Sequence, residues 1–147
     1  MLSLKVLFYT AILLWTVSLI VPYKVVDPEM AAYETEYLHY VNKHCTKDKY
    51  FSNPVQKHFK VDDLPANHVA VCTTNNTTKM HITYNRKYWE MDRHEARMIT
   101  MFHELTHCYF YQDHIEDSEH FMYAYENHLP LDVVKLQLEA YLMEKCK

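Results

Sequence analysis

The pentapeptide His103-Glu104-Leu105-Thr106-His107 is the part of this 147-residue chain whose residue types and spacing point most directly to chemistry. Two histidines four positions apart lie one turn apart on one helix face, where both imidazoles can reach a single Zn²⁺ ion. The glutamate between them need not bind the metal. Its carboxylate can act as a general base that takes a proton from water and returns it to the leaving amine. The pattern predicts hydrolysis with His103 and His107 as metal ligands and Glu104 as base.

A catalytic zinc ion takes three protein ligands and keeps one position open. His114, eleven residues after His103, is our first choice for the third ligand, because it falls just past the helix where the chain can turn back. Asp113 and His120 are alternatives, and so is Glu139 if the last helix packs across the motif helix. Nearby acids that could orient the ligand imidazoles are Asp113, Glu116 and Asp117.

The stretch from Phe102 to Cys108, with Asp113 and His114, resembles the metzincin group of zinc metallopeptidases, and most closely small HExxH-type metallopeptidases of bacteria and phages. The resemblance covers residues 79–125. It implies a zinc endopeptidase with His103, His107 and His114 as ligands, Glu104 as base, Met122 as a hydrophobic floor below the metal, and Ile82–Tyr84 as an edge strand that pairs with an extended substrate.

The chain departs from the metzincin pattern in the turn that follows the motif. Metzincins usually place the third histidine ten residues after the first, with a glycine between them; here Phe110 stands at the glycine position and the histidine comes one residue later. We therefore expect Gln112 or Asp113 to adopt left-handed backbone. Thr106 replaces the glycine that is usual inside the motif. Tyr123 and Tyr125 are either oxyanion donors or core aromatics.

The elements that must position these residues follow from periodicity and capping signals. Asp27-Pro28-Glu29 opens a helix that runs to about His44, and Asp92 with Glu95 opens the motif helix, which runs to about Tyr111. The other expected elements are strands at 68–74 and 79–84 joined as a hairpin, irregular segments at 45–67 and 112–130, and a last helix that starts at 130–132. Residues 27–147 thus predict one small α+β domain, and the resemblance implies that it is of zincin or metzincin type.

Residues 6–23 form an uncharged apolar run behind a short tail, residues 1–5. As a helix this run would span about 27 Å, close to the hydrocarbon thickness of a bilayer. A cleaved signal peptide is the rival interpretation, but the small residues of a cleavage site are missing around Val17–Tyr23. We expect a single-pass anchor that holds the catalytic domain outside the cytoplasm, or a secreted domain if residues 1–23 are removed.

Composition limits the remaining possibilities. The absence of glycine excludes Walker and dinucleotide-binding loops, and a net charge of −4 argues against a nucleic-acid partner. All four cysteines follow the apolar run, which predicts disulfides in an oxidising compartment, with three pairings open; they are Cys45, Cys72, Cys108 and Cys146. The expected partners are a peptide or protein substrate and, through residues 6–23, a membrane.

Two other functions compete with the peptidase hypothesis. One is a non-catalytic binding module on a membrane anchor, stabilised by a closed zinc site with Cys108, His120 or Glu139 as fourth ligand. The other is a metal-free membrane protein whose exported domain binds a partner.

Overall fold

The computed structural model describes residues 25–52, 54, 56–75, 78–124 and 129–147. Within these residues the chain forms a four-stranded sheet and four helices. The strands are β1 (Val25–Val26), β2 (Gln56–Asp62), β3 (Ala70–Thr74) and β4 (Lys79–Asn85). The helices are α2 (Pro28–His44), α3 (Arg86–Met91), α4 (His94–Phe110) and α5 (Leu131–Lys145). The α+β class predicted from the sequence is confirmed at this level.

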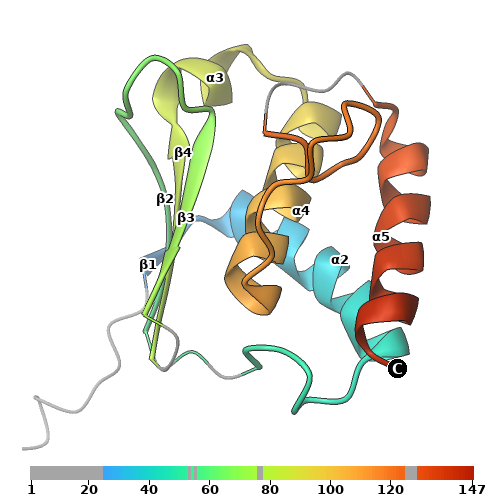
Figure 1. Ribbon diagram of the computed structural model, residues 1–147. Coiled ribbons are helices and arrows are strands. Elements are labelled where there is room, and N and C mark those ends of the chain that lie inside the picture. The colour runs from blue at the N-terminus through green and yellow to red at the C-terminus, as the bar shows by residue number, and fades with distance from the viewer. Residues whose placement is uncertain (1–24, 53, 55, 76–77, 125–128) are drawn as a thin grey trace, which may run out of the picture.

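The sheet has the strand order β1-β2-β4-β3, with β1, β2 and β4 parallel and β3 antiparallel to β4. The predicted hairpin is therefore present as β3 and β4. Figure 1 shows the sheet edge-on, with α2, α4 and α5 on one side of it. The side chains that face these helices are fully buried: Phe59, Met80, Ile82 and Tyr84. Because β4 lies between β2 and β3, the expectation that Ile82–Tyr84 forms an edge strand is wrong, and β3 is the edge beside α4.

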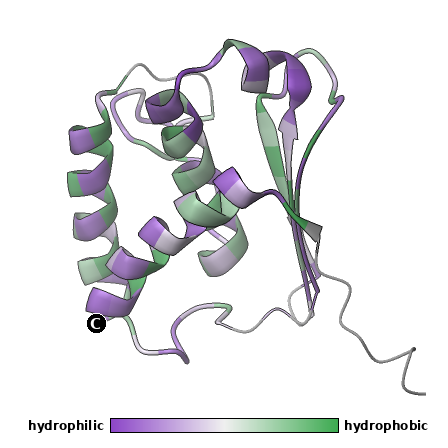
Figure 2. Cartoon of the chain, turned by 180° about the vertical axis from the view of Figure 1, so that it is seen from behind, coloured by the Kyte–Doolittle hydropathy of each residue, from purple (hydrophilic) through white to green (hydrophobic). Residues whose placement is uncertain are grey.

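Helix α2 forms where the sequence predicts it. The Asp27 carboxylate accepts hydrogen bonds from the backbone N–H groups of Glu29 and Met30, and Pro28 occupies the first turn, where its missing N–H costs nothing. A buried stripe that includes Tyr37 and Val41 faces the interior. Figure 2 shows the same alternation of hydrophobic and hydrophilic faces on the helices seen from behind. Helix α4 packs against this buried face of α2.

Helix α4 begins slightly later than its capping signal suggests. Its N-cap is Arg93, with no side-chain cap hydrogen bond. Asp92 instead ends α3, and its carboxylate accepts a 2.6 Å hydrogen bond from the Tyr84 hydroxyl on β4. The predicted Asp92–Glu95 capping box is therefore wrong, because the Asp92 carboxylate bonds to Tyr84 on β4 and does not cap α4.

The predicted fold class, a zincin-type domain behind an N-terminal transmembrane helix, needs correction. No helix in the described part of the chain has the length and apolar character needed to cross a membrane. The predicted anchor at residues 6–23 lies outside the described residues. In addition, residues 45–67, which we expected to be irregular, contain β2, and this strand makes the sheet mixed rather than a simple hairpin.

Two disulfides resolve the pairing that the sequence leaves open. Cys45–Cys146 joins the C-terminal ends of α2 and α5, and Cys72–Cys108 joins β3 to α4. The prediction of disulfides is confirmed.

Candidate metal centre

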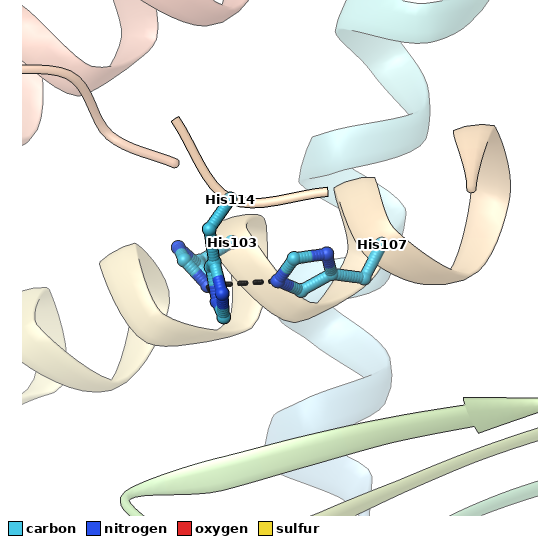
Figure 3. Close-up of side chains that lie close together, drawn as sticks. All are labelled: His103, His107 and His114. Carbon is cyan, nitrogen blue, oxygen red and sulfur yellow. Dashed lines mark hydrogen bonds between the residues drawn. The ribbon is translucent and has the colours of Figure 1, made fainter. Parts of the chain in front are cut away.

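Three imidazoles converge beside α4. His103 and His107 lie one turn apart on the helix, and His114 reaches them from the segment that follows (Figure 3). The Nε2 atom of His103 lies 2.9 Å from Nε2 of His107 and 3.2 Å from Nε2 of His114. Within the described residues, these three side chains are the only group of three or more potential ligands close enough to share one metal ion.

Backbone carbonyls orient the two helical imidazoles. Nδ1 of His103 donates to the carbonyl oxygen of Phe121 at 2.8 Å, and Nδ1 of His107 donates to the carbonyl oxygen of Gln112. A carbonyl oxygen only accepts, so each Nδ1 carries the hydrogen and each Nε2 is left with a bare lone pair. We expected Asp113, Glu116 or Asp117 to orient the imidazoles. The hydrogen-bond partners of the His103 and His107 Nδ1 atoms are backbone carbonyls instead.

Burial keeps both helical imidazoles neutral. It lowers the pKa of His103 to about 4, against the opposing effect of the Phe121 carbonyl, and it also lowers the pKa of His107. Near neutral pH two lone pairs therefore face each other across 2.9 Å and repel, unless a cation lies between them.

The donor set fits a zinc ion. With Zn–N bonds of about 2.0–2.1 Å, a tetrahedral ion separates its nitrogen ligands by about 3.3 Å. The two Nε2 separations from His103 lie slightly below this value, and all three potential ligand atoms lie within 4.8 Å of one another. Three imidazoles also leave one tetrahedral position open.

The turn that brings His114 back is made by Tyr111. This residue has φ 53° and ψ 33°, the left-handed conformation that usually favours glycine, and it is the one described non-glycine residue with positive φ. The expectation that Gln112 or Asp113 takes this conformation is wrong by one or two residues. Beyond the turn, the backbone N–H of Ile115 donates to the carbonyl of Met122 at 2.9 Å, which holds the two returning segments together. Met122 is fully buried, and its role as a floor below the metal stays a prediction.

Glu104 lies between the two helical ligands in sequence and is 7% exposed. Its Oε2 accepts a 2.6 Å hydrogen bond from the backbone N–H of Cys72 on the edge strand. Burial raises the pKa of Glu104 to about 7, and the Cys72 N–H partly opposes this shift. The residue can thus hold or release a proton near neutral pH.

The three histidines of the cluster and Glu104 all line one cleft of about 1040 Å³. Residues 67–72 and 74 form part of its wall on the side of β3, and a largely apolar wall is formed by Ala96, Ile99, Leu129 and Leu131. Thr106, the residue that replaces the motif glycine, does not line the cleft, and its hydroxyl lies 3.0 Å from the Tyr37 hydroxyl. The threonine therefore serves the packing of α4 on α2.

The alternative ligands lie elsewhere. Asp113 lines the cleft but is not in the histidine cluster. His120 accepts a hydrogen bond at Nδ1 from the N–H of Met122. Glu139 pairs with Lys43 at 2.6 Å. Cys108 is disulfide-bonded, so none of the fourth ligands expected for a closed structural site belongs to the cluster. Tyr123 lines the cleft, and Tyr125 lies outside the described residues.

The sequence gives no signal for the groups that hold the site in place. They are mainly backbone atoms, at Cys72, Gln112 and Phe121, and a backbone atom has no side-chain signature. Gln137 on α5 is a side chain that we did not single out: its amide accepts from the N–H of Phe121 and donates to the carbonyl of Glu119.

No family model, curated protein or solved structure matches this chain.

Proposed function

We propose that this protein is a zinc-dependent metallopeptidase in which His103, His107 and His114 hold the metal and Glu104 is the general base. The observation that carries the proposal is the pair of bare Nε2 atoms 2.9 Å apart, joined by a third imidazole in an open cleft. Two neutral imidazoles gain nothing from placing their acceptor nitrogens against each other, whereas a cation shared by them makes the arrangement favourable.

When bound, zinc would supply the activation of water and the polarisation of the peptide carbonyl. In this proposal, Glu104 is the group of this chain that moves the proton. Its Oε2 is occupied by the Cys72 N–H, which leaves Oε1 to accept a proton from the attacking water. The water oxygen bonds to the carbonyl carbon, the C–N bond breaks, and the proton passes from Glu104 to the leaving amine.

The edge strand gives the substrate a place to bind. Residues 70–72 and 74 line the cleft, and β3 has a strand neighbour on one side only. An extended peptide can pair with an edge strand through main-chain hydrogen bonds, although the N–H of Cys72 is already bonded to Glu104. The proposed substrate is therefore a peptide or an extended segment of a protein.

The two disulfides favour a protein that works in an oxidising compartment. Both link elements that are far apart in sequence, so the domain would form them while folding.

Metal analysis combined with Glu104→Gln tests the proposal. We expect one zinc per chain in the purified protein and in the variant, together with hydrolysis of a fluorogenic peptide library that the variant loses by a factor on the order of 10²–10⁴ in kcat. Glu144→Gln on the exposed end of α5 is the matched control and should keep full activity. Zinc-loaded wild-type protein that cleaves no peptide would overturn the peptidase assignment, and protein that binds no zinc would overturn the metal centre.

A further inference from the structure

Cys72 contacts α4 at two points that lie one turn apart. Its backbone N–H donates to Oε2 of Glu104 at 2.6 Å, and its sulfur is bonded to Cys108, with the two Cα atoms 5.8 Å apart. Residues at i and i+4 share one helix face, so Glu104 and Cys108 both face β3. One residue of the edge strand therefore holds two successive turns of the motif helix.

The direction of the Cys72 amide matters for Glu104. On an edge strand, alternate N–H groups point away from the sheet, because only every second residue bonds to the neighbouring strand. Cys72 lies opposite Ile82 in the β3–β4 ladder, and its N–H points to α4. Among the described residues, this amide is the one protein donor to the Glu104 carboxylate.

The disulfide is the covalent link between this part of β3 and α4. The carboxylate sits at the wall of an open cleft, and the strand that supplies its donor is at the sheet's edge. A covalent link one turn further along the helix fixes the spacing between strand and helix, and hence the length and angle of the Cys72–Glu104 hydrogen bond.

We propose that the Cys72–Cys108 disulfide is a positioning device for the general base: it fixes β3 against α4 so that the Cys72 amide holds one Glu104 oxygen and turns the other toward the reacting water. The inference rests on the proposed function for its catalytic consequence, whereas the hydrogen bond that it fixes can be tested without any activity. A thiol pair at these positions would let the strand move away and leave the carboxylate free to rotate.

The chain supplies a matched control in its second disulfide. Cys45–Cys146 closes a loop with a sequence separation of 101, compared with 36 for Cys72–Cys108, and it lies at the ends of α2 and α5. Because stabilisation by a disulfide grows with the loop it closes, loss of Cys45–Cys146 should destabilise the fold at least as much. A purely structural role for Cys72–Cys108 would therefore give both variants the same phenotype.

The test compares Cys72→Ser/Cys108→Ser with Cys45→Ser/Cys146→Ser, both zinc-loaded and at a temperature where both are folded. We expect the first variant to lose kcat by about tenfold to a hundredfold, since a misplacement of about 1 Å can cost that much, with KM and bound zinc unchanged. The control should keep its kcat within twofold. Equal kcat in the two variants would overturn the inference.

Amide hydrogen exchange at Cys72 gives a readout that needs neither zinc nor activity. Exchange at residue 72 should be slow in the wild type and faster by at least tenfold in Cys72→Ser/Cys108→Ser. It should also be faster by at least tenfold in Glu104→Ala, which keeps both disulfides. The control Cys45→Ser/Cys146→Ser should exchange at the wild-type rate. If the serine pair does not fold, Cys72→Ala/Cys108→Val, which fills the space with apolar atoms, replaces it. Unchanged exchange in the folded disulfide variant would overturn the inference; wild-type protein that protects Cys72 but cleaves no peptide would overturn the proposed function alone.

Discussion

Replacing Gln137 by alanine should weaken zinc binding, although this side chain is not a ligand. Its Oε1 accepts from the N–H of Phe121 at 2.8 Å, and its Nε2 donates to the carbonyl of Glu119 at 2.6 Å. Gln137 thus anchors the segment whose Phe121 carbonyl orients the His103 ring. The alanine variant removes both anchors and leaves the carbonyl free to drift, so that the ring is no longer held with Nε2 toward the other imidazoles.

The expected size of the effect follows from these two hydrogen bonds. Each contributes about 1 kcal/mol net, so the pair contributes about 2 kcal/mol. If all of this appears in the metal site, the zinc Kd rises about thirtyfold, since about 1.4 kcal/mol corresponds to a factor of ten. The value agrees with the roughly 10–100-fold losses seen when partners of metal ligands are removed.

Zinc competition with a chelating dye near neutral pH measures the change. Gln137→Glu keeps the acceptor for the Phe121 N–H and loses the donor to Glu119, so its Kd should lie between those of the wild type and Gln137→Ala. Leu136→Ala, at a neighbouring position that is 67% exposed, is the matched control. A Gln137→Ala protein that folds and binds zinc within twofold of the wild type would refute the reasoning that Phe121 orients His103.

Two further predictions concern stability. Tyr111→Gly should change the free energy of unfolding by no more than about 1 kcal/mol, because relief of the left-handed conformation offsets the greater freedom of glycine in the unfolded chain. Tyr111→Val should destabilise the fold by about 2 kcal/mol. Urea unfolding that finds the two variants equally stable would contradict this prediction. The hydrogen bond from Tyr33, with smaller contributions from Arg97, lowers the pKa of Glu29 below 4.5, so its stabilising effect is present above pH 4.5 and is lost as the pH falls further. Glu29→Gln should therefore show a shallower loss of stability on acidification than the wild type, and parallel curves of stability against pH would count against it.

The local signals in the sequence predicted those elements that carry their own caps or turns. Asp27-Pro28 and the apolar stripe behind it specify α2, and the turn after Thr74 specifies the hairpin, because each of these signals acts over a few residues. The three histidines were also predictable, since a spacing of four on a helix places two of them on one face and the third needs only a turn.

Strand β2 could not be predicted in the same way. Its sequence is largely polar, and Phe59 is its one fully buried apolar side chain. Lys57 points inward because Glu34 on α2 is buried opposite it, 2.6 Å from its Nζ. A partly buried ion pair between residues 23 positions apart is a tertiary feature. The local sequence around Lys57 carries no sign of it and is typical of a solvated loop.

The turn residue was missed for a related reason. Left-handed backbone is intrinsically easier for Gln112 or Asp113 than for tyrosine, yet Tyr111 adopts it. The helix ends at Phe110, and the Tyr111 ring stacks on Phe51 from the segment between α2 and β2. Local preference is overridden here by a contact that only the folded chain makes.

The link between Cys45 and Cys146 closes residues 45–146 into a covalent ring that contains the histidine cluster, the residues that line the cleft, and helices α4 and α5. A single backbone cut within that ring would release no piece. Self-cleavage or attack by another protease at one exposed loop would leave a two-chain molecule of unchanged mass except for one added water, and the damage would become visible only after the disulfides are reduced.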